Sequence, residues 1–155
     1  MKIYLPALLV FFVMVIKESF GCEDPLGMES GEIVDSEITA SSYHGSGFYA
    51  PSNARLHMQP VEGKSDGAWS AGELAVLQWV QIDLGSVKKV TAIATQGHPF
   101  KKQWVKGYMV SYGNDPMDFT KYRKLFRGNT DSNTVVKNKL NPPIEARYIR
   151  VVAYN

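Results

Sequence analysis

The residues of this chain that could carry out chemistry are few and scattered. Three histidines, His44, His57 and His98, and the single cysteine, Cys22, lack the paired spacing of metal ligands. The acidic residues are equally dispersed, so no carboxylate pair suits glycoside hydrolysis. This pattern favours a protein that binds its target without reacting with it, and we expect no enzyme activity.

Two short motifs have catalytic or cofactor-binding spacing but lack the required context. Gly45-x-Gly47-x-x-Ala50 matches a dinucleotide-binding loop, yet a proline follows it in place of the helix that such a loop needs. Ser86-x-x-Lys89 has the spacing of a serine nucleophile and its lysine, but the partner motifs of those enzymes are absent from the sequence. Neither motif predicts a site.

Two long connections carry the side chains best suited to binding. Residues 43–51 are rich in glycine and aromatic residues, and residues 97–104 mix apolar and basic side chains. Binding residues concentrate on loops held by a rigid scaffold, and an aromatic group beside lysines suits a sugar face or an anionic lipid surface. His98 is expected to be a solvated loop residue, with no role as a metal ligand or as an acid or base. The candidate ligand contacts are Phe48, Tyr49, His98, Phe100, Lys101 and Lys102.

Short β-strands are expected to position these loops. Val80, Ile82 and Leu84 alternate with polar residues, as in a half-buried strand. Similar β-branched and aromatic segments cover 33–42, 79–84, 89–95, 105–112 and 147–152. Gly85-Ser86 predicts a turn, and Pro142-Pro143 is expected to precede the last strand because proline donates no ladder hydrogen bond. The pattern predicts an all-β sandwich or jelly roll.

Several aromatic and charged residues are expected to be structural. We expect the core to contain Trp69, Trp79, Tyr108, Tyr112 and Tyr148. Arg147 and Arg150 are expected to form ion pairs or hydrogen bonds. Asp83 is expected to accept a hydrogen bond at a strand end, and Trp104 to pack under its loop.

The first 21 of the 155 residues have the form of a secretory signal peptide. Lys2 is followed by an apolar run from Ile3 to Ile16, too short to span a membrane. Cleavage before Cys22 is expected, with a lipoprotein signal acylated at Cys22 as the alternative. Secretion makes an unpaired thiol unusual and leaves a covalent dimer through Cys22 open.

Charge is divided unevenly along the chain. Residues 22–83 contain ten acidic and two basic residues, whereas residues 84–155 contain four acidic and thirteen basic residues. Such asymmetry can mark an anionic partner, but two halves that interleave in a sandwich need not form a charged patch. The net charge of +2 is too small to indicate nucleic-acid binding, and we expect no nucleic-acid partner.

Ordered motifs across residues 22–155 resemble the discoidin domain, also called the coagulation factor V/VIII type C domain. They include Ile38-Thr-Ala-Ser-Ser42, Gln78-Trp-Val-Gln-Ile-Asp-Leu-Gly85, Val90-Thr-Ala-Ile-Ala-Thr-Gln-Gly97 and Pro143-Ile-x-Ala-Arg-Tyr-Ile-Arg150. The resemblance implies an eight-stranded jelly-roll sandwich, secreted or on the cell surface, with ligand-binding loops at one end. Members of the family bind glycans, anionic phospholipids, collagen or other proteins.

The resemblance also assigns the loops. Residues 43–51 correspond to the first ligand loop, the segment leading to Trp69 to the second, and residues 97–104 to the third. Some members hold a structural calcium ion near the first loop, for which Asn53 or Asp66 would be the candidates here.

Two departures from the family pattern shape the functional expectation. The phospholipid-binding members have adjacent tryptophans at the first loop tip, where this chain has Gly45-Ser46-Gly47-Phe48. We therefore expect an extracellular glycan or glycoprotein ligand in lectin-like recognition or cell adhesion, with anionic phospholipid as the alternative. The family continues past Asn155 through a last strand to a cysteine that pairs with the first, so this chain is expected to lack both and to be marginally stable. A fragment of a larger extracellular enzyme or receptor is the third reading.

Overall fold

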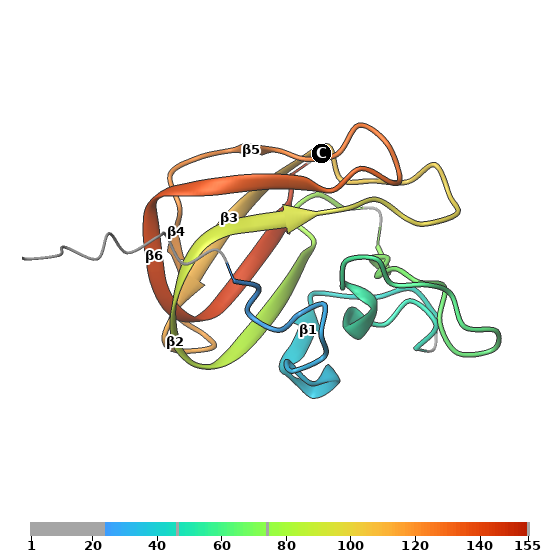
Figure 1. Ribbon diagram of the computed structural model, residues 1–155, viewed down its shortest axis with the longest axis horizontal. Helices are drawn as coiled ribbons and strands as arrows, with labels where there is room; N and C mark the ends of the chain where they lie inside the picture. The colour runs from blue at the N-terminus through green and yellow to red at the C-terminus, as the bar shows by residue number, and fades with distance from the viewer. Residues whose placement is uncertain (1–23, 46, 74, 155) are drawn as a thin grey trace, which may run out of the picture.

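The structure, a computed structural model, describes residues 24–154 apart from residues 46 and 74. The predicted signal peptide, residues 1–21, and Cys22 lie outside the described residues. The elements in chain order are η1 (Asp35–Glu37), β1 (Ile38–Ala40), η2 (Pro51–Asn53), β2 (Trp79–Thr95), β3 (Gly107–Gly113), β4 (Thr120–Lys121), β5 (Phe126–Arg127) and β6 (Val136–Ala153) (Figure 1). In the described part of the chain, no helix is long and apolar enough to cross a membrane.

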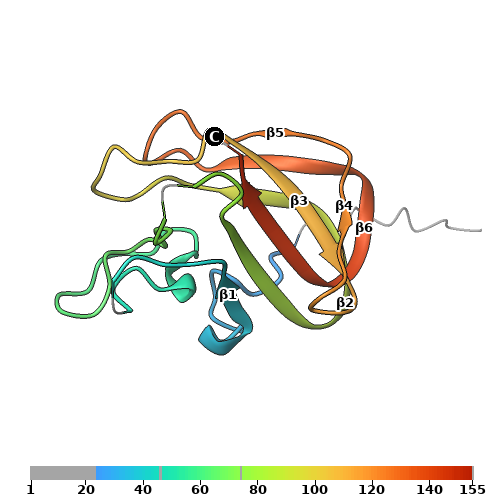
Figure 2. The same ribbon diagram turned by 180° about the vertical axis from the view of Figure 1, so that it is seen from behind.

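All of the strands pair antiparallel in one sheet. Its order is β1-β2-β6-β3-β4, and β5 also pairs with β3. The long strands β2 and β6 curve strongly, so the sheet wraps over itself, as both views show (Figures 1 and 2). The expected all-β architecture is confirmed. Six strands are found among the described residues where eight were expected, partly because β2 continues through a bend that the sequence suggested was a turn.

The glycine at position 85 bends β2 without ending it. The pairing of β2 with β6 shifts register between Asp83 and Lys88, and Gly85 lies within this shift with φ of 72°. This left-handed conformation favours glycine. The Gly85 N–H donates to Asp83 Oδ1 at 2.8 Å. The predicted turn at Gly85-Ser86 is therefore wrong: the feature is an irregularity inside one strand.

The expectation that the proline pair precedes the last strand is also wrong. Pro142 and Pro143 lie inside β6. The β2–β6 register jumps from Val90 opposite Ile144 to Ala92 opposite Lys139. The prolines occupy the stretch that this jump leaves unpaired, so their missing N–H groups interrupt no ladder hydrogen bond.

The first predicted strand is much shorter than expected. Of residues 33–42, only Ile38–Ala40 forms a strand, and η1 precedes it. The Glu37 carboxylate accepts the Val34 N–H at 3.0 Å and thereby stabilises this 3₁₀ turn. A local side chain to backbone hydrogen bond therefore replaces strand pairing here.

The apolar side chains form two clusters. The larger one lies between β2, β3 and β6 and includes Tyr108, Val110, Phe126 and Ile149. The smaller one joins the N-terminal segment to β1 and β2 through Ile33, Ile38, Val80 and Ile82. Of the aromatic residues expected in the core, Tyr108 and Tyr148 are buried, whereas Tyr112 and Trp69 pack against the clusters while partly buried.

The arginines of β6 are held by β2, as expected. Arg147 forms two 2.8 Å hydrogen bonds with the Asp83 carboxylate, and Arg150 donates twice to Gln81 Oε1. The Arg150 guanidinium also lies 4.0 Å from the ring centroids of both Trp79 and Phe119. Trp79 is half-buried under this cation and is not a residue of the core.

Candidate functional site

Three loops meet at one end of the sheet. The first loop (residues 43–51), the second loop (54–69) and the third loop (97–104) all lie on the right in Figure 1. The Asp66 N–H donates to Phe48 O at 3.0 Å and thereby joins the second loop to the first. The Lys101 ammonium donates to Tyr49 Oη at 3.2 Å and joins the third loop to the first. The loops assigned by the family resemblance therefore form one surface.

A buried histidine orders the third loop. The Nδ1 atom of His98 accepts the N–H groups of Phe100 and Lys101 at 3.2 and 3.1 Å. A ring nitrogen that accepts carries no proton, so the proton of the neutral ring is on Nε2, which donates to Asp66 Oδ2 at 2.6 Å. His98 is only 4% exposed. The expectation of a solvated His98 is wrong, and we assign this residue a positioning role in place of ligand contact.

Asp66 is the centre of the network. Its Oδ2 atom accepts hydrogen bonds from both His98 and Lys101. Partial burial opposes ionisation of Asp66, but the bonds from Lys101 and His98 outweigh it, so the pKa of Asp66 lies below its ordinary value of 3.8. The hydrogen bond to Asp66 in turn raises the pKa of Lys101 above 10.5. The pair therefore stays charged across the physiological pH range.

Aromatic side chains gather beside this ion pair. The Tyr49 ring lies 5.3 Å from Phe48 and 5.5 Å from His44, both edge to face. Lys101 Nζ lies 4.9 Å from the Tyr49 centroid. Tyr49 is thus held on several sides and is half-buried.

The remaining candidates lie on the outside of the third loop. Phe100 is 72% exposed, and Lys102 beside it is exposed. The structure thus brings His98, Lys101 and Tyr49 into one network and leaves Phe100 and Lys102 to solvent. Ligand contact by Phe48, Tyr49, Phe100, Lys101 and Lys102 stays a prediction.

The two candidate calcium ligands already take part in hydrogen bonds of the loop network. Asn53 is buried and uses its amide nitrogen to donate to Phe48 O at 2.9 Å. Asp66 Oδ2 is occupied by an ammonium and an imidazole N–H. Calcium needs six to eight oxygen ligands, and the described residues include no group of three or more acidic, histidine or cysteine residues able to hold a metal. Asn53 and Asp66 thus help to join the loops, and calcium binding by them stays a prediction.

Sequence reasoning missed a fourth segment, residues 128–134, that supports the third loop. Asn129 is 1% exposed and donates to Thr95 O at 3.2 Å and to Thr134 O at 2.6 Å. Ser132 Oγ donates to Lys101 O at 2.7 Å. A Cβ atom on Gly97 would lie 2.7 Å from Ser132 Cα, so the close approach requires glycine. The Gly128-Asn129 pair, a dipeptide typical of turns, is the sequence feature that could have found this segment.

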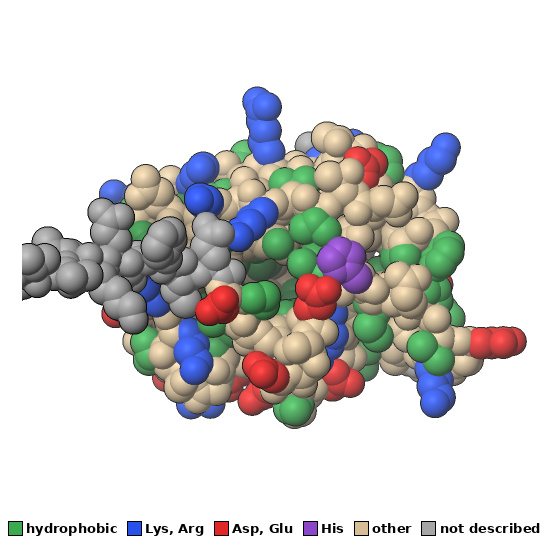
Figure 3. Space-filling model, viewed as in Figure 1, with side chains coloured by type: hydrophobic (Ala, Val, Ile, Leu, Met, Phe, Trp, Pro, Cys, Tyr) green, Lys and Arg blue, Asp and Glu red, His purple; other side chains and the backbone are tan. Residues whose placement is uncertain are grey.

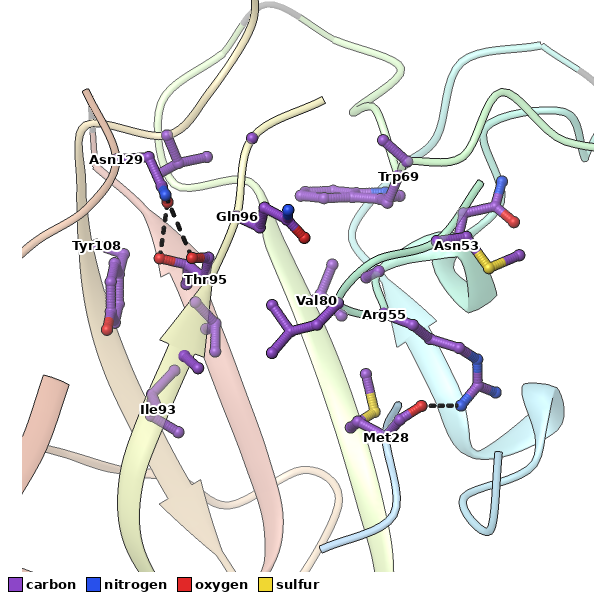
Figure 4. Close-up of a pocket in the computed structure, with 18 of the residues that line it drawn as sticks. Met28, Asn53, Arg55, Trp69, Val80, Ile93, Thr95, Gln96, Tyr108 and Asn129 are labelled. Atoms are coloured by element: carbon purple, nitrogen blue, oxygen red, sulfur yellow. Dashed lines mark hydrogen bonds between the residues drawn. The ribbon is translucent and has the colours of Figure 1, made fainter. Parts of the chain in front are cut away.

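The loops stand over a cavity of about 1540 Å³ that lies between the two apolar clusters. Figure 4 shows Val80, Ile93 and Tyr108 on its sheet side and Trp69 across from them. Near the loops Gln96 and the hydrogen-bonded pair Thr95 and Asn129 supply polar atoms (Figure 4). The lining is mainly apolar and offers a surface for contact.

Comparison with known proteins places the chain in a family. Residues 37–155 match the F5/8 type C domain. Human coagulation factor V is 41% identical over 144 residues, which cover 85% of this chain. The match spans only 6% of the length of that much longer relative.

Solved structures show the same fold. Discoidin II from Dictyostelium discoideum is 27% identical with a TM-score of 0.69, covering 76% of this chain and 48% of that one. The CBM32 of AlyQ in complex with 4,5-unsaturated mannuronic acid is 25% identical with a TM-score of 0.55, covering 76% and 81%. The expected jelly-roll sandwich is thus confirmed. The chain belongs to the F5/8 type C, or discoidin, domain family.

Proposed function

We propose that this chain is a secreted, non-catalytic module that binds an extracellular glycan or glycoprotein, in lectin-like recognition or cell adhesion, through its first and third loops. The observation that supports this most directly is the network in which Asp66 holds His98 and Lys101. Because three loops are locked together before any ligand arrives, little ordering of the loop surface opposes binding.

The exposed side chains of the third loop suit a sugar. Phe100 offers an apolar surface to a sugar ring, and Lys102 offers a charge to a carboxylate or a hydroxyl group. The structural relative in complex with 4,5-unsaturated mannuronic acid, an acidic sugar, supports this choice of ligand class. His98 acts behind the surface by accepting the Phe100 N–H, and Asn129 holds the segment 128–134 that supports the third loop.

Anionic phospholipid is the second candidate. Its support is the 72% exposure of Phe100, which could insert into a lipid surface beside Lys102. The Lys101 charge is already paired with Asp66, so it contributes less attraction to an anionic surface than a free lysine. Within the third loop, one exposed ring and one lysine without an ion pair favour the glycan over the membrane.

A matched pair of variants tests the glycan proposal. We expect Phe100→Ser to weaken glycan-array binding of the secreted chain about 10- to 100-fold, since burying such a ring contributes about 1.5–3 kcal/mol. Met117→Ser is the control, because Met117 is 89% exposed but lies in the segment that follows β3, outside the three loops. Equal binding by both variants would overturn the role of the third loop.

Vesicles separate the two candidates. Sedimentation with phosphatidylserine vesicles at low and high salt should show little binding by the wild-type chain. Strong vesicle binding that salt weakens, combined with a blank glycan array, would replace the glycan by the membrane as the ligand of this site.

Secretion is tested separately. Expression in a secreting cell should release the chain into the medium, and its amino-terminal residue should be Cys22. A protein retained in the cell with residues 1–21 attached would contradict this part of the proposal.

A further inference from the structure

A second surface with a different character runs along one edge of the sheet. Within the seven residues 121–127 there are four cationic side chains, Lys121, Arg123, Lys124 and Arg127. All four are exposed. Among the residues that the structure describes, none of them forms an ion pair with a carboxylate, and Lys124 Nζ lies 5.0 Å from the Phe126 ring centroid. We call residues 120–127 the basic edge.

The fold forces these cations outward. Tyr122 and Phe126 point into the larger core cluster, where Phe126 stacks on Tyr108 at 5.4 Å and lies 5.6 Å from Tyr122. With the aromatic side chains of the segment anchored inside, its basic side chains remain on the solvent side. The sequence pattern alone therefore encodes a one-sided basic surface.

Strand β3 fixes the backbone of the basic edge at several points. Lys121 pairs with Ser111, and Arg127 pairs with Gly107. Between them the Tyr122 N–H donates to Val110 O at 2.8 Å. The cations are thus spread along a line of at most about 20 Å, the length of six extended residue steps.

Charge is also segregated on a larger scale. In Figure 3 several Lys and Arg side chains lie over the upper left of the molecule, where β5 and β6 lie, and others project at the lower left and on the right. Most Asp and Glu side chains in this view lie in the lower centre, near β1. Lys106 extends the basic edge at one end, because its carbonyl accepts the Gly128 N–H at 2.8 Å directly after Arg127. Part of the uneven charge along the sequence is therefore also uneven in space.

We propose that the basic edge binds a linear sulfated polysaccharide. A row of exposed, unpaired cations matches a chain that carries sulfate groups at regular intervals. Arginine donates in a fork that suits a sulfate oxygen pair, as it suits phosphate. This site is separate from the loop surface and goes beyond the function proposed for it.

The geometry favours a polysaccharide over other polyanions. Proteins that bind single-stranded nucleic acid combine cations with exposed aromatic side chains on which bases stack. At the basic edge the Phe126 ring is buried, and the half-buried Tyr122 ring packs against the larger core cluster. A membrane is a plane, whereas these cations follow one edge of a sheet and have Leu125 as their one exposed apolar neighbour within the segment.

The test compares two double variants of the full chain that lose the same charge. R123Q/R127Q removes two cations of the basic edge, and K64Q/K88Q removes two exposed lysines elsewhere. With heparin as the probe in a binding titration, we expect R123Q/R127Q to raise the Kd about 10- to 30-fold. K64Q/K88Q should stay within about twofold of the wild-type chain. Thermal melting confirms that both variants are folded.

Several outcomes would overturn the proposal. Equal weakening in both variants would mean that heparin senses net charge alone. Undiminished binding of chemically desulfated heparin would exclude sulfate as the recognised group. Tighter binding to a single-stranded oligonucleotide or to phosphatidylserine vesicles, lost in R123Q/R127Q, would assign the edge to another polyanion. F100S should leave heparin binding intact, so failure here and failure of the loop proposal are distinguishable.

Discussion

The loop end, formed by residues 43–51, 54–69 and 97–104, and the basic edge both contain lysine or arginine. They differ in whether the positive charge is paired with a carboxylate. At the loop end Lys101 is paired with Asp66, lies against Tyr49 and has a side chain 41% exposed. At the basic edge Arg123 and Arg127 are exposed with no ion pair to a carboxylate among the described residues. The paired cation shapes the protein, whereas the unpaired cations are available to a ligand. Counting basic residues in a sequence does not separate these two uses.

Among the variants considered, Asp66→Asn at the loop end is expected to reduce the free energy of unfolding most. The change removes the carboxylate that holds His98 and Lys101 and leaves a buried imidazole N–H with a weaker partner. Loss of such a charge-assisted network costs about 2–3 kcal/mol. Urea unfolding of the variant and the wild-type chain measures the difference.

Asp35→Asn is the matched control for this variant. Asp35 pairs with Arg55, but the Asp35 side chain is 76% exposed. The Arg55 side chain, only 10% exposed, keeps its hydrogen bonds to Met28 O and Ile33 O in the variant, so we expect a loss of less than about 1 kcal/mol. If the two substitutions destabilised the chain equally, the Asp66 network would have no special structural role.

A smaller change in stability is expected when the pH is varied. The pKa of Asp66 is lowered on folding, so its contribution is present above about pH 4 and is lost as pH falls through the folded-state pKa. The pKa of Lys101 is raised, so its contribution is present below about pH 10.5 and is lost as pH rises further. The stability difference between wild type and D66N should therefore be flat near neutral pH and shrink at both ends. Melting temperatures across pH 3–11 measure it, and a difference that grew toward acid would contradict the assignment.

The smallest effect is expected from the basic edge. R123Q/R127Q should change the free energy of unfolding by less than about 0.5 kcal/mol, as surface substitutions without partners do. Urea unfolding beside D66N gives the contrast directly. A large loss of stability would mean that these arginines have structural partners and are not free for a ligand.

Sequence reasoning reached the scaffold more reliably than the site. The alternation in residues 79–84 and the ordered family motifs were enough for an all-β jelly roll, because burial of one face imposes a period of two. Short strands such as Thr120–Lys121 were missed because two residues carry no detectable period. Pro142 was misplaced because no local rule reveals where a long strand will leave its partner.

The position of the candidate site could be predicted from the sequence, but the roles of its individual residues could not. Loop position and residue type correctly brought Tyr49, His98 and Lys101 together. Burial of His98 could not be read from the sequence, because it depends on Asp66, which lies 32 positions earlier in the chain. The sequence around Asn129 likewise indicates only a turn, although its amide holds two backbone carbonyls.

Trp79 shows how a neighbouring side chain can cover an aromatic ring that could otherwise contact a ligand. The Arg150 guanidinium, shared with Phe119, already covers Trp79 at 4.0 Å. A sugar could dock there only by displacing a cation that Gln81 also anchors. The Trp79 ring is therefore not an open platform for a ligand, although it lies on a strand and is only half-buried.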